Sequence, residues 1–233
     1  MMDFDEVENP IVIQATMESE SFPKKVLEKM PDGSTLIEYL VKRIRSELDY
    51  HKPIVLATSN TEIDIPLEEE GRRLNLLVIR DSSINLIERM LLASEILLAK
   101  NIIRIMGISP LVDLKSMNSL LDIHLKNDFD YSYNGGEKGV ISGMDVDIFK
   151  IETLEKISQL ELNESLKRDC ELYIRNHTES FKIYHLKRES HLNDSQIDLW
   201  IDTPQDLERV RKISENVTTI NDDEIRKAYH SLQ

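Results

Sequence analysis

Residues 11–25 of the chain read IVIQATMESESFPKK, a short apolar run followed by a longer polar stretch. The run at residues 11–13 consists of β-branched side chains, which is typical of a buried strand. The polar stretch, residues 15–25, follows the carboxyl end of that strand. Open α/β sheets bind their ligands beyond the carboxyl ends of the strands. This part of the sequence therefore predicts a first strand whose following loop borders a ligand site.

The rest of the chain alternates strand patterns with helix patterns. The strands predicted from the sequence are residues 11–13, 54–57, 74–79, 102–106, 145–149 and 181–186. The helices predicted from periodicity and capping signals are residues 35–48, 82 or 83 to 100 (capped by Ser82 or Ser83), 114–125, 152–160, 165–174, 204–213 and 222–231. Residues 131–141, with a turn at 134–136, indicate a small β excursion. This alternation predicts a single α/β domain with a mostly parallel mixed sheet and helices on both faces.

Charge and composition disfavour some classes of function. The chain has 29 basic and 43 acidic side chains, which gives a formal net charge of −14. Nucleic acids and anionic lipids attract basic surfaces, so neither a nucleic acid nor a membrane is an expected partner. A few local cations or backbone N–H groups can still bind a phosphate ligand.

The N-terminus and the cysteine content indicate the compartment. Residues 1–9 are expected to form an acidic tail without the regions of a secretion signal, and residues 10–233 to form the domain. No apolar run reaches the roughly 20 residues that a membrane-spanning helix needs. Cys170 is the only cysteine, which fits a reducing compartment. We therefore expect a cytoplasmic protein in which Cys170 is a packed, small apolar side chain.

Six segments resemble, in order, the motifs of one enzyme family. They are residues 15–25 (against A-R-M-x-S-x-R-L-P-x-K), 57–59 (ATS), 80–89 (against R-G-S-x-x-D-V-L-x-R), 104–113 (against R-I-T-G-D-C-P-L-I-D), 143–149 (against G-x-D-V-E-V-F) and 202–207 (against D-T-P-E-D-L). On these segments the chain resembles the spore coat polysaccharide biosynthesis protein F family, relatives of the CMP-Kdo and acylneuraminate cytidylyltransferases. The resemblance implies a Rossmann-like nucleotide-diphospho-sugar domain of the GT-A type.

The resemblance also implies a reaction and residues for it. A hydroxyl group of a sugar acid would attack the α-phosphate of CTP and release pyrophosphate, as part of CMP-sugar and surface-polysaccharide synthesis. The residues at nucleotide-binding positions are Ala15, Met17, Ser19, Lys25, Arg80 and Ser82. The catalytic positions hold Lys25 and Asp202, the substrate positions hold Asp145 and Lys167, and Asp202 is also the matched Mg²⁺ ligand. Relatives commonly dimerise, so we expect a homodimer or a partner of an active paralogue.

The chain departs from the family pattern at several positions. Thr16 and Ser21 stand where the family has arginines, the side chains that bind phosphate through two parallel hydrogen bonds. Ile108 stands where the family has a metal-binding aspartate, and an apolar side chain supplies no oxygen to Mg²⁺. Residues 167–169 replace an R-E-H segment. These departures predict weak or absent Mg²⁺ binding and reduced or lost transfer activity.

Other functions and simpler structural roles stay open from the sequence alone. A non-catalytic pseudoenzyme could keep the fold as a nucleotide-binding, regulatory or heteromeric partner protein, and a glycosyltransferase would have a similar fold class. Asp202 lies just before Pro204 and could cap a helix instead of holding metal. Asp145 and Asp147 share a face of a predicted strand and could be ordinary surface acids. Trp200 is expected to pack beneath the site.

Overall fold

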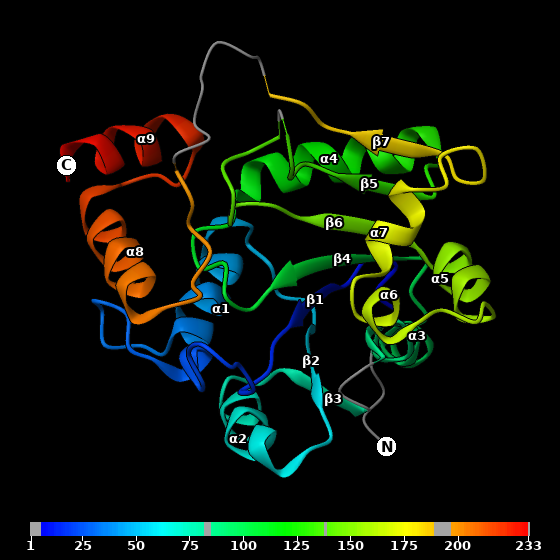
Figure 1. Ribbon diagram of the computed structural model, residues 1–233, viewed down its shortest axis with the longest axis horizontal. Coiled ribbons are helices and arrows are strands. Elements are labelled where there is room, and N and C mark those ends of the chain that lie inside the picture. The colour runs from blue at the N-terminus through cyan, green and yellow to red at the C-terminus, as the bar shows by residue number, and fades with distance from the viewer. Residues whose placement is uncertain (1–5, 82–84, 138, 189–196, 233) are drawn as a thin grey trace.

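The computed structural model describes residues 6–81, 85–137, 139–188 and 197–232, and its centre is one seven-stranded sheet (Figure 1). The strand order is β3-β2-β1-β4-β6-β5-β7. The strands are β1 (Ile11–Gln14), β2 (Ile54–Ser59), β3 (Leu77–Asp81), β4 (Asn101–Met106), β5 (Tyr131–Tyr133), β6 (Asp147–Lys150) and β7 (Ile183–His185). Strand β6 runs antiparallel to β4 and β5, and the other neighbouring pairs are parallel. The mostly parallel mixed sheet expected from the sequence is confirmed.

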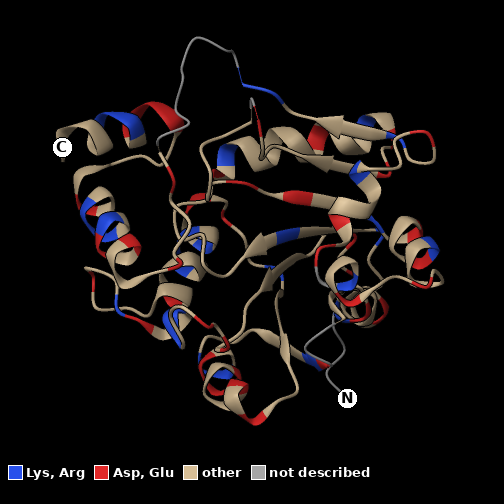
Figure 2. Ribbon diagram, viewed as in Figure 1, with Lys and Arg blue, Asp and Glu red and all other residues tan. Residues whose placement is uncertain are grey.

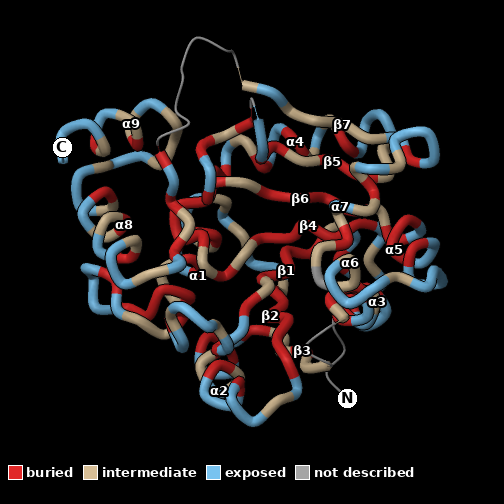
Figure 3. The backbone as a smooth tube through the Cα atoms, viewed as in Figure 1, coloured by how far each residue is buried: buried red, intermediate tan, exposed pale blue. Residues whose placement is uncertain are grey.

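Helices cover both faces of this sheet, which is also confirmed. The helices are α1 (Leu36–Glu47), α2 (Ile65–Arg73), α3 (Leu86–Leu97), α4 (Leu114–Asn127), α5 (Ile151–Ser158), α6 (Glu164–Arg168), α7 (Cys170–Arg175), α8 (Pro204–Asn216) and α9 (Asp222–Ser231), with short 3₁₀ helices at Lys25–Leu27 and Glu62–Asp64. Side chains alternate across a strand, so Ile11 and Ile13 pack with α1, α2 and α4, whereas Val12 packs with α3, α5 and α7. The strands between these layers are the most buried part of the chain (Figure 3). Cys170 is buried in the second layer, as expected.

The C-terminal helices α8 and α9 form a third apolar core beside the sheet (Figure 1). Leu199 and Ile201, in the segment that leads into α8, are buried there with Met144. Thr203 caps α8: its hydroxyl accepts from the N–H of Asp206, and the carboxylate of Asp206 accepts from the N–H of Thr203. The sequence-based alternative that Asp202 caps this helix is therefore wrong.

The largest difference from the predicted elements lies between β2 and β3. Helix α2 was not predicted, because its sequence, IPLEEEGRR, is mostly polar and lacks an apolar periodicity. In the structure, only Leu67 and Gly71 of this helix are buried. Leu74 and Leu76 are buried and made residues 74–79 resemble a strand, but Leu74 ends α2 and β3 begins at Leu77. The predicted boundary was wrong because one short helix and the next strand share a single apolar run.

Smaller differences concern helix starts and breaks. The cap of α3 is Asn85, whose side chain accepts from the N–H of Glu88, and not Ser82 or Ser83, which lie outside the described residues. The helix predicted over residues 165–174 is two short helices, α6 and α7, which meet at Asp169. Part of the predicted excursion is strand β5 of the main sheet. Residues before 10 also pack, since Val7 is buried in the second core.

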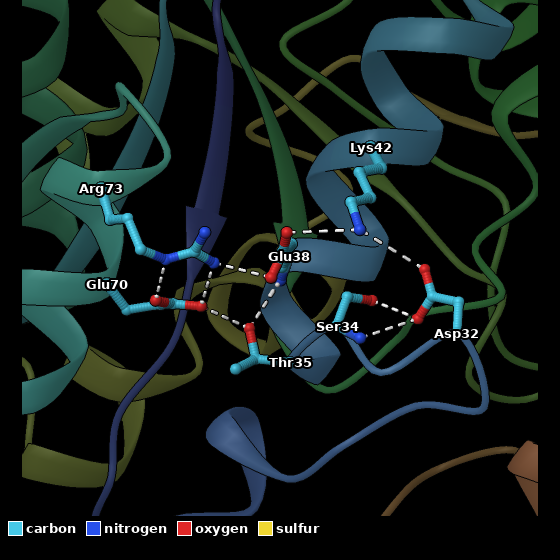
Figure 4. A network of polar contacts seen from close by, with 7 residues as sticks. All are labelled: Asp32, Ser34, Thr35, Glu38, Lys42, Glu70 and Arg73. Carbon is cyan, nitrogen blue, oxygen red and sulfur yellow. Dashed lines mark hydrogen bonds and ion pairs between the residues drawn. The ribbon is translucent and has the colours of Figure 1, made fainter.

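A polar network joins α2 to the start of α1 (Figure 4). The hydroxyl of Thr35, the cap of α1, donates to Glu70 at 2.6 Å. Arg73 contacts both Glu70 and Glu38, and Lys42 extends the network from Glu38 to Asp32. The network holds α2 in place, which matters because the residue just before α2 lies in the candidate site.

His124 on α4 is buried at the other end of the sheet. Its Nε2 donates to Oδ1 of Asn101 at 3.1 Å, so its Nδ1 accepts from the hydroxyl of Ser132 at 2.8 Å. Burial lowers the pKa of His124 from 6.5 to about 4, against the opposing charges of Asp128 and Asp130. The folded protein therefore holds this side chain neutral at pH values where the unfolded chain protonates it.

This difference predicts a pH-dependent loss of stability. We expect the free energy of unfolding to fall by on the order of 2–3 kcal/mol between about pH 6.5 and about pH 4, because only the unfolded chain protonates His124 in that window. His124→Gln should remove this part of the slope, and His51→Gln, at an exposed site, should not. Urea unfolding at a series of pH values measures the slopes, and identical slopes for wild type and H124Q would contradict the expectation.

Candidate functional site

The loop after β1 lies at the carboxyl ends of the parallel strands. The N–H of Ala15 donates to the carbonyl oxygen of Ala57 on β2 at 3.1 Å. The N–H of Gly107, just after β4, donates to the carbonyl oxygen of Gln14 on β1 at 2.7 Å. A Cβ atom at position 107 would lie 2.6 Å from the Cβ of Ala15, so this close approach requires glycine. The predicted placement of residues 15–25 at this edge is confirmed.

Asp64, directly before α2, fixes this loop to the end of β2. Its fully buried carboxylate accepts from the N–H groups of Met17 and Ser59 and from the hydroxyls of Thr16, Thr58 and Ser59. Burial alone would raise the pKa of Asp64, but the hydrogen bonds from Ser59 and Met17 bring it below its ordinary value. Sequence reasoning missed Asp64. The available signal was a proline two residues later, a common mark of a helix start.

Lys25 and Asp202 come from distant motifs and meet at the same edge. Nζ of Lys25 lies 3.0 Å from Oδ1 of Asp202. The side chain of Lys25 is 9% exposed and that of Asp202 is 68% exposed, so the pair opens to solvent on the carboxylate side. The capping of α8 by Thr203 leaves the Asp202 carboxylate available for this contact. The structure thus brings together the two residues at the predicted catalytic positions.

The other matched loop residues shape the backbone around Lys25. Ala15 and Met17 are buried in the first core, and Met17 donates its N–H to Asp64 at 2.6 Å. The hydroxyl of Ser19 accepts from the N–H of Phe22 at 3.2 Å. The contacts of Ala15, Met17 and Ser19 with a nucleotide stay predictions.

The residues that replace the family arginines hold the loop instead. The hydroxyl of Thr16 bonds to both oxygens of Asp64 at 3.1 Å, and that of Ser21 donates to the carbonyl oxygen of Asp202 at 2.7 Å. Both side chains tie residues 15–25 to neighbouring segments. Neither carries the positive charge that an arginine would offer to a triphosphate.

Arg80, a predicted nucleotide contact, has protein partners in this structure. Its Nε donates to the carbonyl oxygen of Ser59 at 3.0 Å, its Nη2 to that of Thr61 at 2.8 Å, and its Nη1 forms an ion pair with Glu68. These contacts join β3 to the segment between β2 and α2. A contact between Arg80 and a nucleotide stays a prediction, and Ser82 lies outside the described residues.

A cavity of about 520 Å³ opens beside the loop, at the carboxyl ends of β1 and β4. Its lining residues are Gln14, Arg104, Met106, Gly136, Val140, Ser142, Asp145, Asp147, Asp169, Glu171, Arg175 and Trp200. The predicted substrate residue Asp145 lies in this lining. Lys167 does not, and two acids from the same part of the chain, Asp169 and Glu171, do. Trp200 also lies in this lining, and its packing beneath the site stays a prediction.

A buried ion network forms the floor of the cavity. Nε and Nη2 of Arg104 donate to Oδ2 of Asp147 at 3.2 and 2.6 Å, and its Nη1 donates to Glu171 at 2.9 Å. Arg175 lies 3.2 Å from Oδ1 of Asp147, which also accepts from the hydroxyl of Tyr131. Burial alone would raise the pKa of Asp147, but the two guanidinium groups hold it below its ordinary value. The sequence-based alternative that Asp147 is a surface acid is wrong.

The residues present do not fit a magnesium site held by two carboxylates. Asp202 supplies one carboxylate, and that carboxylate already pairs with Lys25. Ile108 is partly buried and packs against the first core. Among the described residues, no group of three or more Asp, Glu, His or Cys side chains is arranged to hold a metal ion.

Charged residues of both signs are interspersed along several helices (Figure 2). Figure 2 shows Lys and Arg next to Asp and Glu along α2, α8 and α9. Within the described part of the chain, no helix combines the length and the apolar character that crossing a membrane requires.

The sheet order, the loop and the cavity together define an α/β fold of the nucleotidyltransferase class. The chain belongs to the cytidylyltransferase family, whose model matches residues 11–225. It is 31% identical to the spore coat polysaccharide biosynthesis protein SpsF of Bacillus subtilis (strain 168) over 206 residues, which cover 87% of this chain and 84% of that protein.

Two solved structures show how far the similarity extends. A cytidylyltransferase from Leptospira borgpetersenii is 27% identical and superposes with a TM-score of 0.86, covering 97% of this chain and 96% of its own. A CMP:2-keto-3-deoxy-manno-octonic acid synthetase complexed with CTP gives a TM-score of 0.66 at 15% identity, over 90% of this chain and 99% of its own. The second likeness concerns the fold alone.

Proposed function

We propose that the protein binds CTP at the loop of residues 15–25 and transfers its cytidylyl group to a sugar acid for surface-polysaccharide synthesis. The meeting of Lys25 with Asp202 beside the cavity carries this proposal. In the reaction, a hydroxyl oxygen of the sugar bonds to the α-phosphorus, the bond to pyrophosphate breaks, and the hydroxyl proton is released to solvent. Family membership and the named relatives support the nucleotide and the polysaccharide context.

We further propose that transfer is slow or absent compared with a typical family member. Phosphoryl-type transfer depends on positive charge placed around the phosphates. In this chain the loop offers Lys24 and Lys25 but also Glu18 and Glu20, and Ile108 supplies no metal ligand. The alternative is a nucleotide-binding pseudoenzyme, cytoplasmic and acting as a homodimer or with an active paralogue. The replacement of the family's metal-binding aspartate by Ile108 favours it, because an apolar side chain supplies no oxygen to Mg²⁺.

Calorimetry with CTP tests the nucleotide site. Lys25→Ala should weaken CTP binding by about 1–3 kcal/mol, the range for losing one charge-assisted contact. Lys24→Ala removes an exposed neighbouring charge and should change the affinity much less. Thermal unfolding should barely shift in K24A and fall more in K25A, because the Lys25 side chain is 9% exposed and its stem is buried, so binding is compared at a temperature where both variants are folded. Tight CTP binding by wild type together with unchanged binding by K25A would refute the assignment of this site.

Release of pyrophosphate from CTP separates the two functions. A panel of sugar acids, assayed with and without Mg²⁺, should give little or no release beyond background from the wild-type protein. Robust release with any sugar acid would overturn the proposal of reduced activity and leave the transferase proposal standing.

A further inference from the structure

A hollow of about 360 Å³ adjoins the cavity at the ends of β5 and β7. Its lining residues are Tyr133, Gly136, Glu137, Arg175, His185 and Lys187. Gly136 and Arg175 also line the cavity, so one ligand can extend from the cavity into the hollow. In the sheet, β5 is the third strand from β1, which the loop of residues 15–25 follows (Figure 1). The hollow is thus placed to receive part of an acceptor rather than part of the nucleotide.

Arg175 is held firmly in the wall that the cavity and the hollow share. Its Nε and Nη2 donate to the hydroxyl of Tyr131 at 3.1 and 2.6 Å, and Nη2 also lies 3.2 Å from Oδ1 of Asp147. The guanidinium lies 3.9 Å from the ring centre of Tyr133. No described residue accepts a hydrogen bond from its Nη1, and the side chain is 30% exposed. These contacts orient the guanidinium before a ligand binds and leave a charged donor for it.

The electrostatic field of the hollow is positive at His185. The ring of this residue stacks on Tyr133 with 4.2 Å between ring centres, and its Nε2 donates to a backbone carbonyl oxygen at 2.9 Å. Burial lowers the pKa of His185, and the charges of Lys187 and Arg175 lower it further, against the backbone hydrogen bond. The carboxylate of Glu137, the one acid in the described lining, does not offset the two cations at this ring. An anion in the hollow would therefore meet a favourable field.

Lys187 is the second charged donor in the lining. Its side chain is exposed, and no described carboxylate forms an ion pair with it. Arg175 and Lys187 come from α7 and from the segment after β7, so the fold brings them to one hollow from separate elements. A group that only accepts hydrogen bonds and carries negative charge suits two such donors.

We propose that the hollow binds the carboxylate of the acceptor sugar acid, through Nη1 of Arg175 and Nζ of Lys187. The sugar ring then lies in the adjoining cavity, where Trp200 and Val140 supply apolar contact. This inference rests on the proposed function and adds the position of the acceptor's charge. The acid group binds at the ends of β5 and β7, away from phosphates bound near Lys25, which keeps two anions of like charge apart.

Calorimetry with two matched sugars tests the carboxylate subsite. D-glucuronate and D-glucuronamide, its neutral analogue of similar shape, are titrated at low ionic strength, where screening is weak. We expect glucuronate to bind at least about tenfold more tightly, the effect of a charge-assisted contact. Lys187→Met should reduce this preference at least about threefold, and Lys187→Arg should keep it. Lys126→Met, at an exposed lysine of α4, should leave it unchanged. Equal binding of the two sugars, no binding of either, or full preference in K187M would overturn the proposal.

The ring of His185 gives a second readout. A bound carboxylate should raise the pKa of His185, because it offsets the charges of Lys187 and Arg175. Glucuronamide should leave the pKa of His185 unchanged, and the exposed His51 should respond to neither sugar. NMR titration of the ring protons measures both residues. An unchanged pKa of His185 at saturating glucuronate would place the carboxylate elsewhere and contradict the proposal.

Titration of CTP into the same samples separates this inference from its foundation. K187M should bind CTP as tightly as the wild-type protein. A loss of CTP affinity in K187M would show a phosphate of the nucleotide in the hollow and overturn the carboxylate assignment. Normal CTP binding without the preference for glucuronate removes only the subsite. An intact preference without CTP binding removes the transferase proposal and leaves the subsite.

Discussion

Replacing Arg104 with methionine is expected to lower the free energy of unfolding by about 3–5 kcal/mol, the usual cost of removing one partner from a buried ion pair. Arg104 contacts two carboxylates, and the side chains of Asp147 and Glu171 are only 7% and 15% exposed. Without Arg104, Glu171 loses an ion-pair partner, and among the described residues Asp147 keeps Arg175 and Tyr131.

A surface pair supplies the control for this experiment. Arg72 contacts Glu68 at 2.7 Å across one turn of α2, but its side chain is 72% exposed. Arg72→Met should therefore cost no more than about 1 kcal/mol. Chemical denaturation of the two variants gives the comparison. If R104M lost as little stability as R72M, the network would not be the buried charge cluster that its geometry describes.

The sheet could be predicted from the sequence because its central strands carry their own signal. Residues 11–13, 54–57 and 102–106 are apolar runs that need no partner to be recognised, since a parallel strand is buried on both faces. The helix at Asp222–Ser231 was predicted with its exact bounds, because Asn221 is a strong cap before an amphipathic pattern. Local signals of this kind fix the type of an element without knowledge of the fold.

Helix α2 escaped prediction for a physical reason. Its buried side is only Leu67 and Gly71, and the Cβ of an alanine at Gly71 would lie 2.6 Å from a side-chain atom of Leu56. The helix is thus held by close packing on β2 and by the polar network of Figure 4, not by a broad apolar stripe. Neither contact is visible in a periodicity of apolar residues.

In the candidate site, too, some residues could be predicted from the sequence, whereas the contacts between strands could not. Lys25, Asp202 and Asp145 could be proposed from the sequence because motif resemblance supplies positions without needing contacts. The pairing of Arg104 with Asp147 depends on β4 and β6 being neighbours, which joins residues 43 positions apart in the sequence. Lys167 does not line the cavity, because the chain breaks between α6 and α7 and places Asp169 in the wall; a contact of Lys167 with a substrate stays a prediction.

Asp64→Asn is expected to have the largest effect on the site, because one side chain holds three segments together. The carboxylate accepts from Thr16 and Met17 of the loop of residues 15–25 and from Thr58 and Ser59 at the end of β2. An asparagine has the same shape but only one accepting oxygen, and its NH₂ group would face N–H and O–H donors. Leaving such buried groups unsatisfied costs about 1–3 kcal/mol for each. We expect D64N to lose roughly 3–5 kcal/mol of stability.

The effect on CTP binding distinguishes positioning from stability alone. In the proposed arrangement, Asp64 contacts the loop and not the nucleotide, so D64N would weaken CTP binding by disturbing the loop. We expect CTP affinity to fall at least tenfold, measured at a temperature where circular dichroism shows that D64N is folded. Glu62→Gln, the exposed carboxylate in the preceding turn, should leave both stability and affinity near wild type. Thr16→Val removes only one donor to Asp64 and should fall between the two. If folded D64N bound CTP as tightly as the wild-type protein, the loop would keep its shape without the hydrogen bonds of the Asp64 carboxylate. The contacts of Ala15 with Ala57, of Ser21 with Asp202 and of Lys25 with Asp202 would then be sufficient to hold it.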